Sequence, residues 1–231
     1  MNYLQLCAKM RRDIGIQGSG PTSVTSQTGN YQRIVDYIAD ADDEIQSLYE
    51  DWDFLRTTVA FNTISATSTY TTAAISAGTV GKWDVESFAF KPNTTSYRPL
   101  SNVDFHDWKN SGDRYYVNTD DEPTQFVIDQ NESIILIPTP DAVYAVQAEH
   151  WVSPSRMAAN TDTSVIPSRF HQMIIELATI KYGTYDENNA LITAAMYQYD
   201  KVWLPRLEAA ELRGSKKSYS SHDPDFIVTP V

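Results

Sequence analysis

The chain has 231 residues and a formal net charge of −12, and 42% of its residues are apolar and 12% aromatic. This composition is typical of a globular protein, and no apolar run approaches the ~18 residues of a membrane span, which excludes membrane insertion. A strongly acidic chain is also unsuited to wrapping tightly around nucleic acid, because proteins that do so neutralise phosphates with cations.

The cysteine content limits the disulfide and metal chemistry that the chain can support. A single cysteine, Cys7, can form neither an internal disulfide nor a thiolate zinc site. The stretch MNYLQLCAKMRRD lacks the apolar core of a signal peptide, so we expect synthesis in a cytoplasm.

Two amphipathic helices are predicted in the first quarter of the chain. The first covers residues 3–14, where apolar side chains recur at spacings of three and four before Gly15. Residues 17–30 contain no charged residue and are predicted to be an irregular connection. The second helix begins at Tyr31 and has an apolar stripe formed by Ile34, Ile38, Ala41, Ile45, Leu48, Trp52 and Leu55.

The pattern changes between residues 56 and 152, where Thr, Val, Ile and aromatic residues are enriched and turn residues recur, as in β structure. Ser101 and Asp104 resemble a capping box, which predicts one short helix at residues 102–109, buried through Phe105 and Trp108. The candidate strands cover residues 58–64, 69–76, 83–90, 125–129, 133–137 and 143–151.

Helical spacing returns after Pro167, a residue tolerated in a first helical turn, and continues to Gly183. A fourth helix is predicted from Glu187 to Leu212. Within it, Pro205 removes a backbone donor and should kink or end the helix.

These elements predict an α+β fold. Because two helices precede the β region and two follow it, the simplest compact arrangement is a four-helix bundle core of residues 1–55 and 166–212. Residues 56–152 then form an inserted antiparallel β module, like a sandwich or a barrel, and residues 153–165 a linker. Residues 213–231 are too polar to fold alone and are predicted to form an extended C-terminal arm.

Acidic residues are concentrated on the second predicted helix, with no basic residue between Asp36 and Asp53. Adjacent carboxylates can bind divalent cations, but the spacing matches no calcium loop, and the helical pitch spreads Asp40, Asp42 and Glu44 around the helix. A solvated acidic face is therefore favoured. A third interpretation is a surface that faces DNA without holding it.

No motif supports an enzyme. The four histidines match no metal-binding spacing, and we expect His171 on a helix surface. The sequence has no nucleophile elbow, phosphate-binding loop or dinucleotide fingerprint. Cys7 lies on an apolar stripe and is expected to be a buried, inert thiol. We therefore predict no catalytic residue, no cofactor and no metal site.

The C-terminal arm combines a basic start with an apolar tip. Arms of this kind become ordered on a partner, by β-augmentation or by filling a groove, and the alternative is a disordered end. The residues expected to make the contact are Lys216, Lys217, Tyr219, Phe226, Ile227 and Val228.

Three stretches, in their order and spacing, match a known family. They are NYLQLCAKMRRDIGIQGSGPTSVTSQTGNYQRIVDYIADADDEIQSLYEDWDFLR at residues 2–56, SIILIPTPDAVYAVQAEHWV at residues 133–152 and VIPSRFHQMIIELATIKYGTYDE at residues 165–187. The chain resembles the head-to-tail adaptor (connector) proteins of tailed bacteriophages, structural subunits that form a ring beneath the portal.

The resemblance implies a ring on the portal axis, expected as a dodecamer, that assembles after genome packaging and leaves a central channel. The implied partners are the portal protein, tail tube or tail hub proteins and other copies of the chain. Double-stranded DNA passes through without specific binding, and no membrane is involved. The protein is expected in the virion at the head–tail interface after synthesis in the host bacterial cytoplasm.

The resemblance also suggests roles for two groups of residues. The arm residues named above are expected to bind the portal. The acidic face is expected to line the channel, where like charge keeps the genome from sticking. Its residues are Asp36, Asp40, Asp43 and Glu50.

Two other functions remain open. In a glycan- or host-surface-binding tail-fibre component, exposed Trp83, Trp108 and Trp151 would stack on sugars, although Trp residues are more often part of a core. A metal-dependent nuclease using the acidic helix is the third function.

Overall fold

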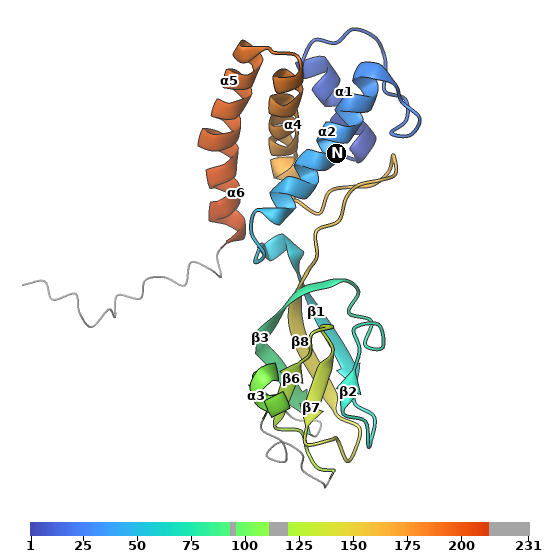
Figure 1. The fold of residues 1–231 in the computed structure, drawn as a ribbon, viewed down its shortest axis with the longest axis vertical. Coiled ribbons are helices and arrows are strands. Elements are labelled where there is room, and N and C mark those ends of the chain that lie inside the picture. Colours follow the sequence, from blue (N-terminus) through green and yellow to red (C-terminus); the bar gives the residue numbers. More distant parts are fainter. Residues whose placement is uncertain (93–95, 111–119, 213–231) are drawn as a thin grey trace, which may run out of the picture. The chain divides into compact units, whose positions relative to one another are not determined.

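The structure is a computed structural model, and it describes residues 1–92, 96–110 and 120–212. The chain divides into two compact units, one formed by residues 1–54 together with the residues from 154 onward, the other by residues 55–153. The first unit is helical and the second contains the strands (Figure 1). The predicted α+β class is confirmed.

The helical unit is organised around α4 (His171–Tyr185), which packs against α1, α2 and α5. Because neighbours cover α4 on several sides, it buries residues around most of its circumference. Gly183 allows a close approach here, since a Cβ atom at this position would lie 2.8 Å from Ile192 Cγ1. The other helices of the unit are α1 (Tyr3–Asp13), α2 (Gly29–Ser47), η3 (Ser168–Phe170), α5 (Asn189–Gln198), η4 (Tyr199–Trp203) and α6 (Leu204–Glu211). A short 3-10 helix, η1 (Asp53–Leu55), directly precedes the first strand in the sequence.

Helix α1 begins with a capping box that satisfies two backbone donors. The Asn2 side chain accepts from Gln5 N at 2.9 Å, and the Gln5 side chain accepts from Asn2 N at 3.0 Å. The predicted first helix is confirmed to within one residue at its end.

Helix α2 is shorter than predicted, and it ends at Ser47 instead of continuing to Leu55. Beyond this end, the Trp52 indole folds back and donates to Ile45 O at 3.1 Å, so a side chain takes the place of the next helical turn. Trp52 is buried as predicted, but the prediction that Leu48 packs in the core is wrong, because Leu48 is 42% exposed.

The helix predicted from Glu187 to Leu212 is divided into α5, η4 and α6, with the interruption just before Pro205. A π-helical turn, η4, follows α5, and Pro205 lies in the first turn of α6, where a missing backbone donor is tolerated. The wider turn takes up the disruption, and the helical path continues to Glu211 (Figure 1).

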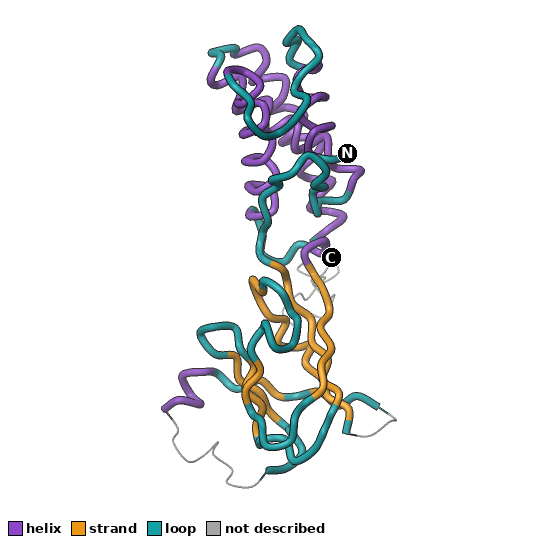
Figure 2. The backbone as a smooth tube through the Cα atoms, turned by 90° about the vertical axis from the view of Figure 1, so that its right-hand side faces the viewer, coloured by secondary structure: helices purple, strands orange, loops and turns teal. Residues whose placement is uncertain are grey.

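Within the described residues, the strands of the β unit form two four-stranded sheets (Figure 2). The first has the order β1-β8-β3-β4 and is antiparallel, and the second has the order β2-β7-β6-β5. The strands of the first sheet are β1 (Arg56–Asn62), β8 (Ala145–Val152), β3 (Val80–Lys91) and β4 (Arg98–Pro99). Those of the second are β2 (Thr69–Tyr70), β7 (Ile134–Ile137), β6 (Gln125–Ile128) and β5 (Ser101–Asn102).

Both sheets contribute to one core. Phe88 of β3 stacks on Phe126 of β6, with ring centroids 3.8 Å apart, and Val146 of β8 and Leu136 of β7 join the same cluster. Burial of these aromatic and aliphatic groups supplies the main stabilisation of the unit.

Several details of the β prediction are wrong. The two sheets do not close into a barrel in the described part of the chain, and β5 pairs with β6 in parallel, so the module is not purely antiparallel. Strand β2 stops at Tyr70, and β4 and β5 were not predicted because two-residue strands carry no periodic signal.

The predicted short helix is present, but the prediction that Ser101 caps it is wrong. Helix α3 (Phe105–Asn110) begins after Asp104, whose Oδ1 accepts from His106 N at 2.8 Å. Ser101 instead lies in β5. Phe105 and Trp108 are half-buried and pack against the cluster around Val127.

Replacing Ile45 by Ala should lower the free energy of unfolding by about 2–5 kcal/mol, because Ile45 is fully buried and a cavity would remain. Urea unfolding monitored by circular dichroism measures this change. The matched control is Leu48→Ala, which should change stability by about 0.5 kcal/mol or less because Leu48 is largely exposed. Equal effects at the two positions would contradict the packing described for α2.

Candidate functional site

The acidic residues of α2 are not uniformly solvated. Asp36 is half-exposed and accepts from Gln32 Nε2 at 2.8 Å. Asp40, one turn further on, forms an ion pair with Arg156 of the segment that returns from the β unit. The carboxylate surface predicted to face DNA therefore carries less free charge than the sequence suggests.

The same neutralisation occurs at Glu44, whose Oε2 lies 2.6 Å from Lys181 Nζ of α4. Asp43 is half-exposed, and Glu50, beyond the end of α2, is exposed. All four predicted channel residues, Asp36, Asp40, Asp43 and Glu50, are therefore at least half-exposed, and Asp40 is paired with a cation.

Asp42 corrects the prediction that these carboxylates stay solvated, because it is fully buried. Its position is four residues after Ile38 and three before Ile45, so it lies on the apolar side of the helix. Its Oδ2 accepts from Gln46 Nε2 at 2.9 Å and its Oδ1 accepts from Ser164 Oγ. A buried carboxylate is tolerated here because donors from two segments satisfy both of its oxygens.

Burial raises the pKa of Asp42 to about 6, although the hydrogen bonds from Ser164 and Gln46 act in the opposite direction. A side chain with such a pKa changes charge under mildly acidic conditions. The network around it is therefore sensitive to pH.

The returning segment, residues 154–166, is fixed to the helical unit by specific hydrogen bonds. Gln46 bonds to both backbone groups of Ser155, accepting from its N–H at 3.1 Å and donating to its carbonyl at 3.2 Å. Further along, Asn160 Oδ1 accepts from Val24 N at 2.7 Å. The segment predicted as a linker thus contacts both α2 and the α1–α2 connection.

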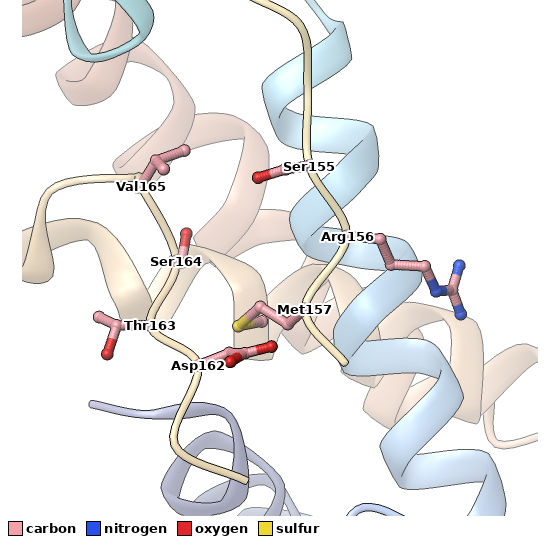
Figure 3. A pocket seen from close by; sticks show the side chains of 7 residues that line it. All are labelled: Ser155, Arg156, Met157, Asp162, Thr163, Ser164 and Val165. Carbon is pink, nitrogen blue, oxygen red and sulfur yellow. The ribbon is translucent and has the colours of Figure 1, made fainter. Parts of the chain in front are cut away.

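A cavity of about 160 Å³ lies within this segment. Figure 3 shows Ser155 and Met157 directed toward the stretch of residues 162–165, with Arg156 directed the other way. Asp162 Oδ2 accepts from the backbone of Ala158 and Ala159, at 2.8 and 2.7 Å, so its carboxylate is already occupied. The cavity shows structural polar contacts and no converging set of catalytic groups among the described residues.

The histidine prediction was wrong for His171, which is buried and not on a helix surface. Its Nε2 lies 2.9 Å from Ile166 O and its Nδ1 lies 2.9 Å from the amino group of Met1. Tertiary contacts from two other segments therefore cover a side chain that the helical pattern left exposed.

The cysteine prediction is confirmed. Cys7 is fully buried, and burial raises the pKa of its thiol to about 12. At physiological pH the thiol remains protonated, and it is a poor nucleophile.

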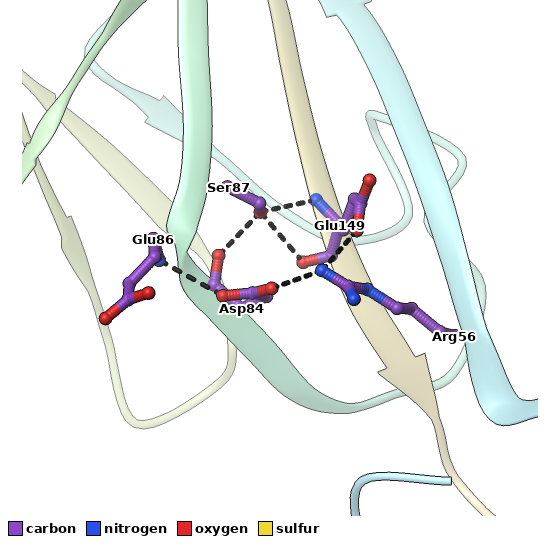
Figure 4. A network of polar contacts seen from close by, with 5 residues as sticks. All are labelled: Arg56, Asp84, Glu86, Ser87 and Glu149. Atoms are coloured by element: carbon purple, nitrogen blue, oxygen red, sulfur yellow. Dashed lines mark hydrogen bonds and ion pairs between the residues drawn. The ribbon is translucent and has the colours of Figure 1, made fainter. Parts of the chain in front are cut away.

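In the β unit, a polar network crosses β1, β8 and β3 (Figure 4). Arg56 NH2 lies 2.6 Å from Asp84 Oδ2 and 2.5 Å from Glu149 Oε2. Strand β3 carries extra residues between Asp84 and Ala89, where its register with β8 shifts. The network holds the strands together at this bulge.

Ser87 replaces the backbone pairing that the bulge interrupts. Its hydroxyl accepts from Glu149 N at 2.8 Å and donates to Asp84 O at 2.6 Å (Figure 4). A side chain thereby satisfies a backbone donor that would otherwise lack its ladder partner.

Of the three tryptophans considered as an exposed sugar-stacking set, Trp83 is buried. Trp83 is 4% exposed and its Nε1 donates to Glu132 O at 3.0 Å. Trp151 is half-buried, with Arg56 5.3 Å and Lys82 5.9 Å from its ring centroid. Trp83 therefore belongs to the core, and Trp151 is flanked by cations of the same chain.

The predicted portal-binding residues Lys216, Lys217, Tyr219, Phe226, Ile227 and Val228 lie outside the described residues.

Comparison with protein families shows to which family the chain belongs. The model of the SU10 adaptor protein family matches residues 1–216, which includes both units. The chain belongs to the SU10 adaptor protein family. No individually curated protein matches it significantly.

Members of this family are phage head-to-tail adaptors, so the protein is a structural component of a virion, and the predicted resemblance is confirmed. Among residues 1–92, 96–110 and 120–212, no three or more His, Cys, Asp or Glu side chains gather as a metal-ligand set. Each helix of the described ranges is too short or too polar to cross a bilayer.

Replacing Asp42 by Asn should flatten the pH dependence of stability. Because the folded-state pKa is raised, the folded protein binds more protons than the unfolded chain between about pH 4 and pH 6, and its free energy of unfolding falls as pH rises through that window. The shift corresponds to a change on the order of 3 kcal/mol, which Asn cannot produce because it does not titrate.

Urea unfolding between about pH 4 and pH 7 tests this prediction. Asp36→Asn, at a half-exposed position six residues earlier on the same helix, is the control and should keep the wild-type slope, whereas Asp43 is unsuitable because its charge helps to raise the Asp42 pKa. An unchanged slope in the Asp42 variant would show that this carboxylate does not titrate in the window.

Replacing Ser87 by Ala should lower the free energy of unfolding of the β unit by about 1–2 kcal/mol, because Glu149 N–H loses its acceptor. Amide hydrogen exchange at Glu149 should accelerate in this variant and recover in Ser87→Thr, which keeps a hydroxyl. Val85→Ala, at an exposed position of the same bulge, is the control. Unchanged exchange at Glu149 would rule out this role for Ser87.

Proposed function

We propose that the protein forms a ring beneath the portal of a tailed phage, joins the filled capsid to the tail and leaves a channel for the genome. The match to the SU10 adaptor family over residues 1–216 carries this proposal. The partners are the portal protein, the tail tube or tail hub proteins and further copies of the chain, expected as a dodecamer. The protein is made in the host cytoplasm before it joins the virion.

The two units have separate tasks in this proposal. Residues 1–55 and 166–212 act as a four-helix bundle domain that forms the ring wall. Residues 56–152 act as an inserted sandwich domain that faces the tail or the periphery, and residues 153–165 connect the two. The shared core of both sheets supports an independent role for the insertion.

The acidic helix is proposed to line the channel through Asp36, Asp40, Asp43 and Glu50. DNA passing a negatively charged wall is repelled and does not adhere, because no cation replaces its counterions. The exposure of Glu50 and the half-exposure of Asp43 support this role, whereas the ion pair with Arg156 weakens the contribution of Asp40.

The C-terminal arm, residues 213–231, is proposed to bind the portal. Tyr219, Phe226, Ile227 and Val228 are its large apolar groups and would supply most of the contact area. Lys216 and Lys217 would meet acidic groups of the portal, which fixes the orientation of the arm.

Deleting residues 214–231 tests the proposed function. The truncated protein should keep the wild-type melting temperature, because the deletion spares α6, the last helix of the described residues, which ends at Glu211. It should fail to attach to filled heads in a reconstitution assay read by electron microscopy. A full-length variant with Lys216 and Lys217 replaced by Arg is the control and should attach normally.

Two results contradict the proposal in different ways. Normal attachment of the truncated protein would remove the portal contact from the arm. Failure of the full-length protein to associate with heads carrying their portal would remove the adaptor function itself.

A further inference from the structure

Helix α5 lacks charge in an otherwise acidic chain. No charged residue lies between Glu187 and Asp200, and the helix itself reads NALITAAMYQ. It is apolar on several sides, and helices of this kind are normally covered all round. Within the described residues, however, Ala195 is the one fully buried side chain of α5.

The side of α5 that faces away from α4 is open. Tyr197 is 62% exposed and Met196 is 45% exposed. Tyrosine and methionine are enriched in protein interfaces, where charged residues are depleted. The described part of the chain therefore leaves an interface-like face on α5 without a partner.

A groove of about 140 Å³ lies along one flank of this helix. Buried Ile175 and Thr179 of α4 and Ala195 of α5 line it, with Ala194 and Gln198 at its α5 edge. A cavity of about 150 Å³ is enough to hold a benzene molecule, so the groove has room for one apolar side chain.

Two carboxylates also line the groove, and both have polar partners within the chain. Asp13 lies 2.7 Å from Lys9 Nζ, and Glu176 accepts from Gln172 Nε2 at 2.7 Å. Lys9 compensates the charge of Asp13, whereas Gln172 satisfies one hydrogen bond of Glu176 and supplies no positive charge.

The groove and Met196 lie on opposite flanks of α5. Ala194 and Gln198 are four residues apart and share one flank, whereas Met196 is two residues from each and is rotated by roughly 200° around the helix. A projecting apolar group on one flank and a groove on the other are the two different surfaces that a head-to-tail contact requires. Such contacts close into rings when the rotation between copies allows.

The charge of the chain favours a second copy of it as the partner that covers α5. Each copy carries a net charge of −12, so two copies repel one another wherever carboxylates meet. They approach one another at the lowest electrostatic cost where few carboxylates meet, and the uncharged α5 provides such a face beside a groove in which Asp13 is paired with Lys9. A basic partner would instead be drawn to the acidic residues of α2.

Building on the ring proposed above, we propose that α5 forms the contact between neighbouring copies. Met196 of one copy enters the groove between α4 and α5 of the next, and Tyr197 extends the contact over its edge. The same helix thereby contacts one neighbour through each flank.

Disulfide cross-linking tests the geometry. A full-length chain carrying both Ala194→Cys and Met196→Cys, assembled on heads that carry their portal, should give a ladder of covalent multimers on mild oxidation. The two new thiols point to opposite flanks and cannot bridge within one chain, and Cys7 is buried. Either single variant should stop at dimers or give none. Rings visible by electron microscopy without a ladder would overturn the proposal.

Charge insertion gives an independent test. The double variant Met196→Glu and Tyr197→Glu should keep its melting temperature but lose ring formation. Val143→Glu, at a 69% exposed position of the β unit, is the matched control and should form rings. If the double variant still forms rings, the α5 contact is overturned and the proposed function is unaffected. If the wild-type protein forms no rings on heads, the proposed function itself is contradicted.

A labelling measurement separates a second copy from residues 213–231 of the same chain as the occupant. In the free subunit, Met196→Cys should react readily with a maleimide and become protected on ring assembly. Protection that exists already in the free subunit and disappears on deletion of residues 214–231 would overturn the proposal.

Discussion

The helical unit depends on the buried side chain of Asp42. The chain leaves this unit after Phe54 and returns at Pro154, so the position of α4 depends on how the returning segment is held. Asp42 and its neighbour Gln46 bond to Ser164 and Ser155, near the two ends of that segment. An apolar residue at position 42 would leave the Ser164 hydroxyl without its acceptor, whereas Gln46 would keep its bond to the Ser155 carbonyl. The specific bonds also fix the register of the segment on α2.

The distribution of charge gives an adaptor distinct surfaces for distinct neighbours. Carboxylates are concentrated on α2, and pairs with Arg156 and Lys181 moderate their repulsion within the fold. Helix α5 carries no charge. The ring proposed above would need both properties, because a channel wall should repel the genome while copies of the chain approach one another.

Periodicity predicted the helices well, and it failed where a side chain or a distant strand ends an element. The stripe through Ile34, Ile38 and Ile45 located α2, but its continuation to Leu48 was wrong, because the helix ends at Ser47 and the Ile45 carbonyl accepts from Leu48 N and the Trp52 indole. The longer strands were found by alternation, whereas β4 and β5 exist only because neighbouring strands lie beside them. No channel or arm contact could be derived from spacing, and those roles came from the family resemblance.

The sequence by itself determined the α+β class, the helical and strand-rich regions, the inert Cys7 and the adaptor family. These properties follow from local patterns and from the order of motifs along the chain. Only the tertiary structure decided that Asp42 and His171 are buried and that Met196 and Tyr197 are exposed. The reason is physical: burial of a polar side chain requires donors and acceptors from distant segments, such as Ser164 for Asp42, and exposure of an apolar one reflects a missing neighbour. Neither condition is encoded in the residues that flank the side chain.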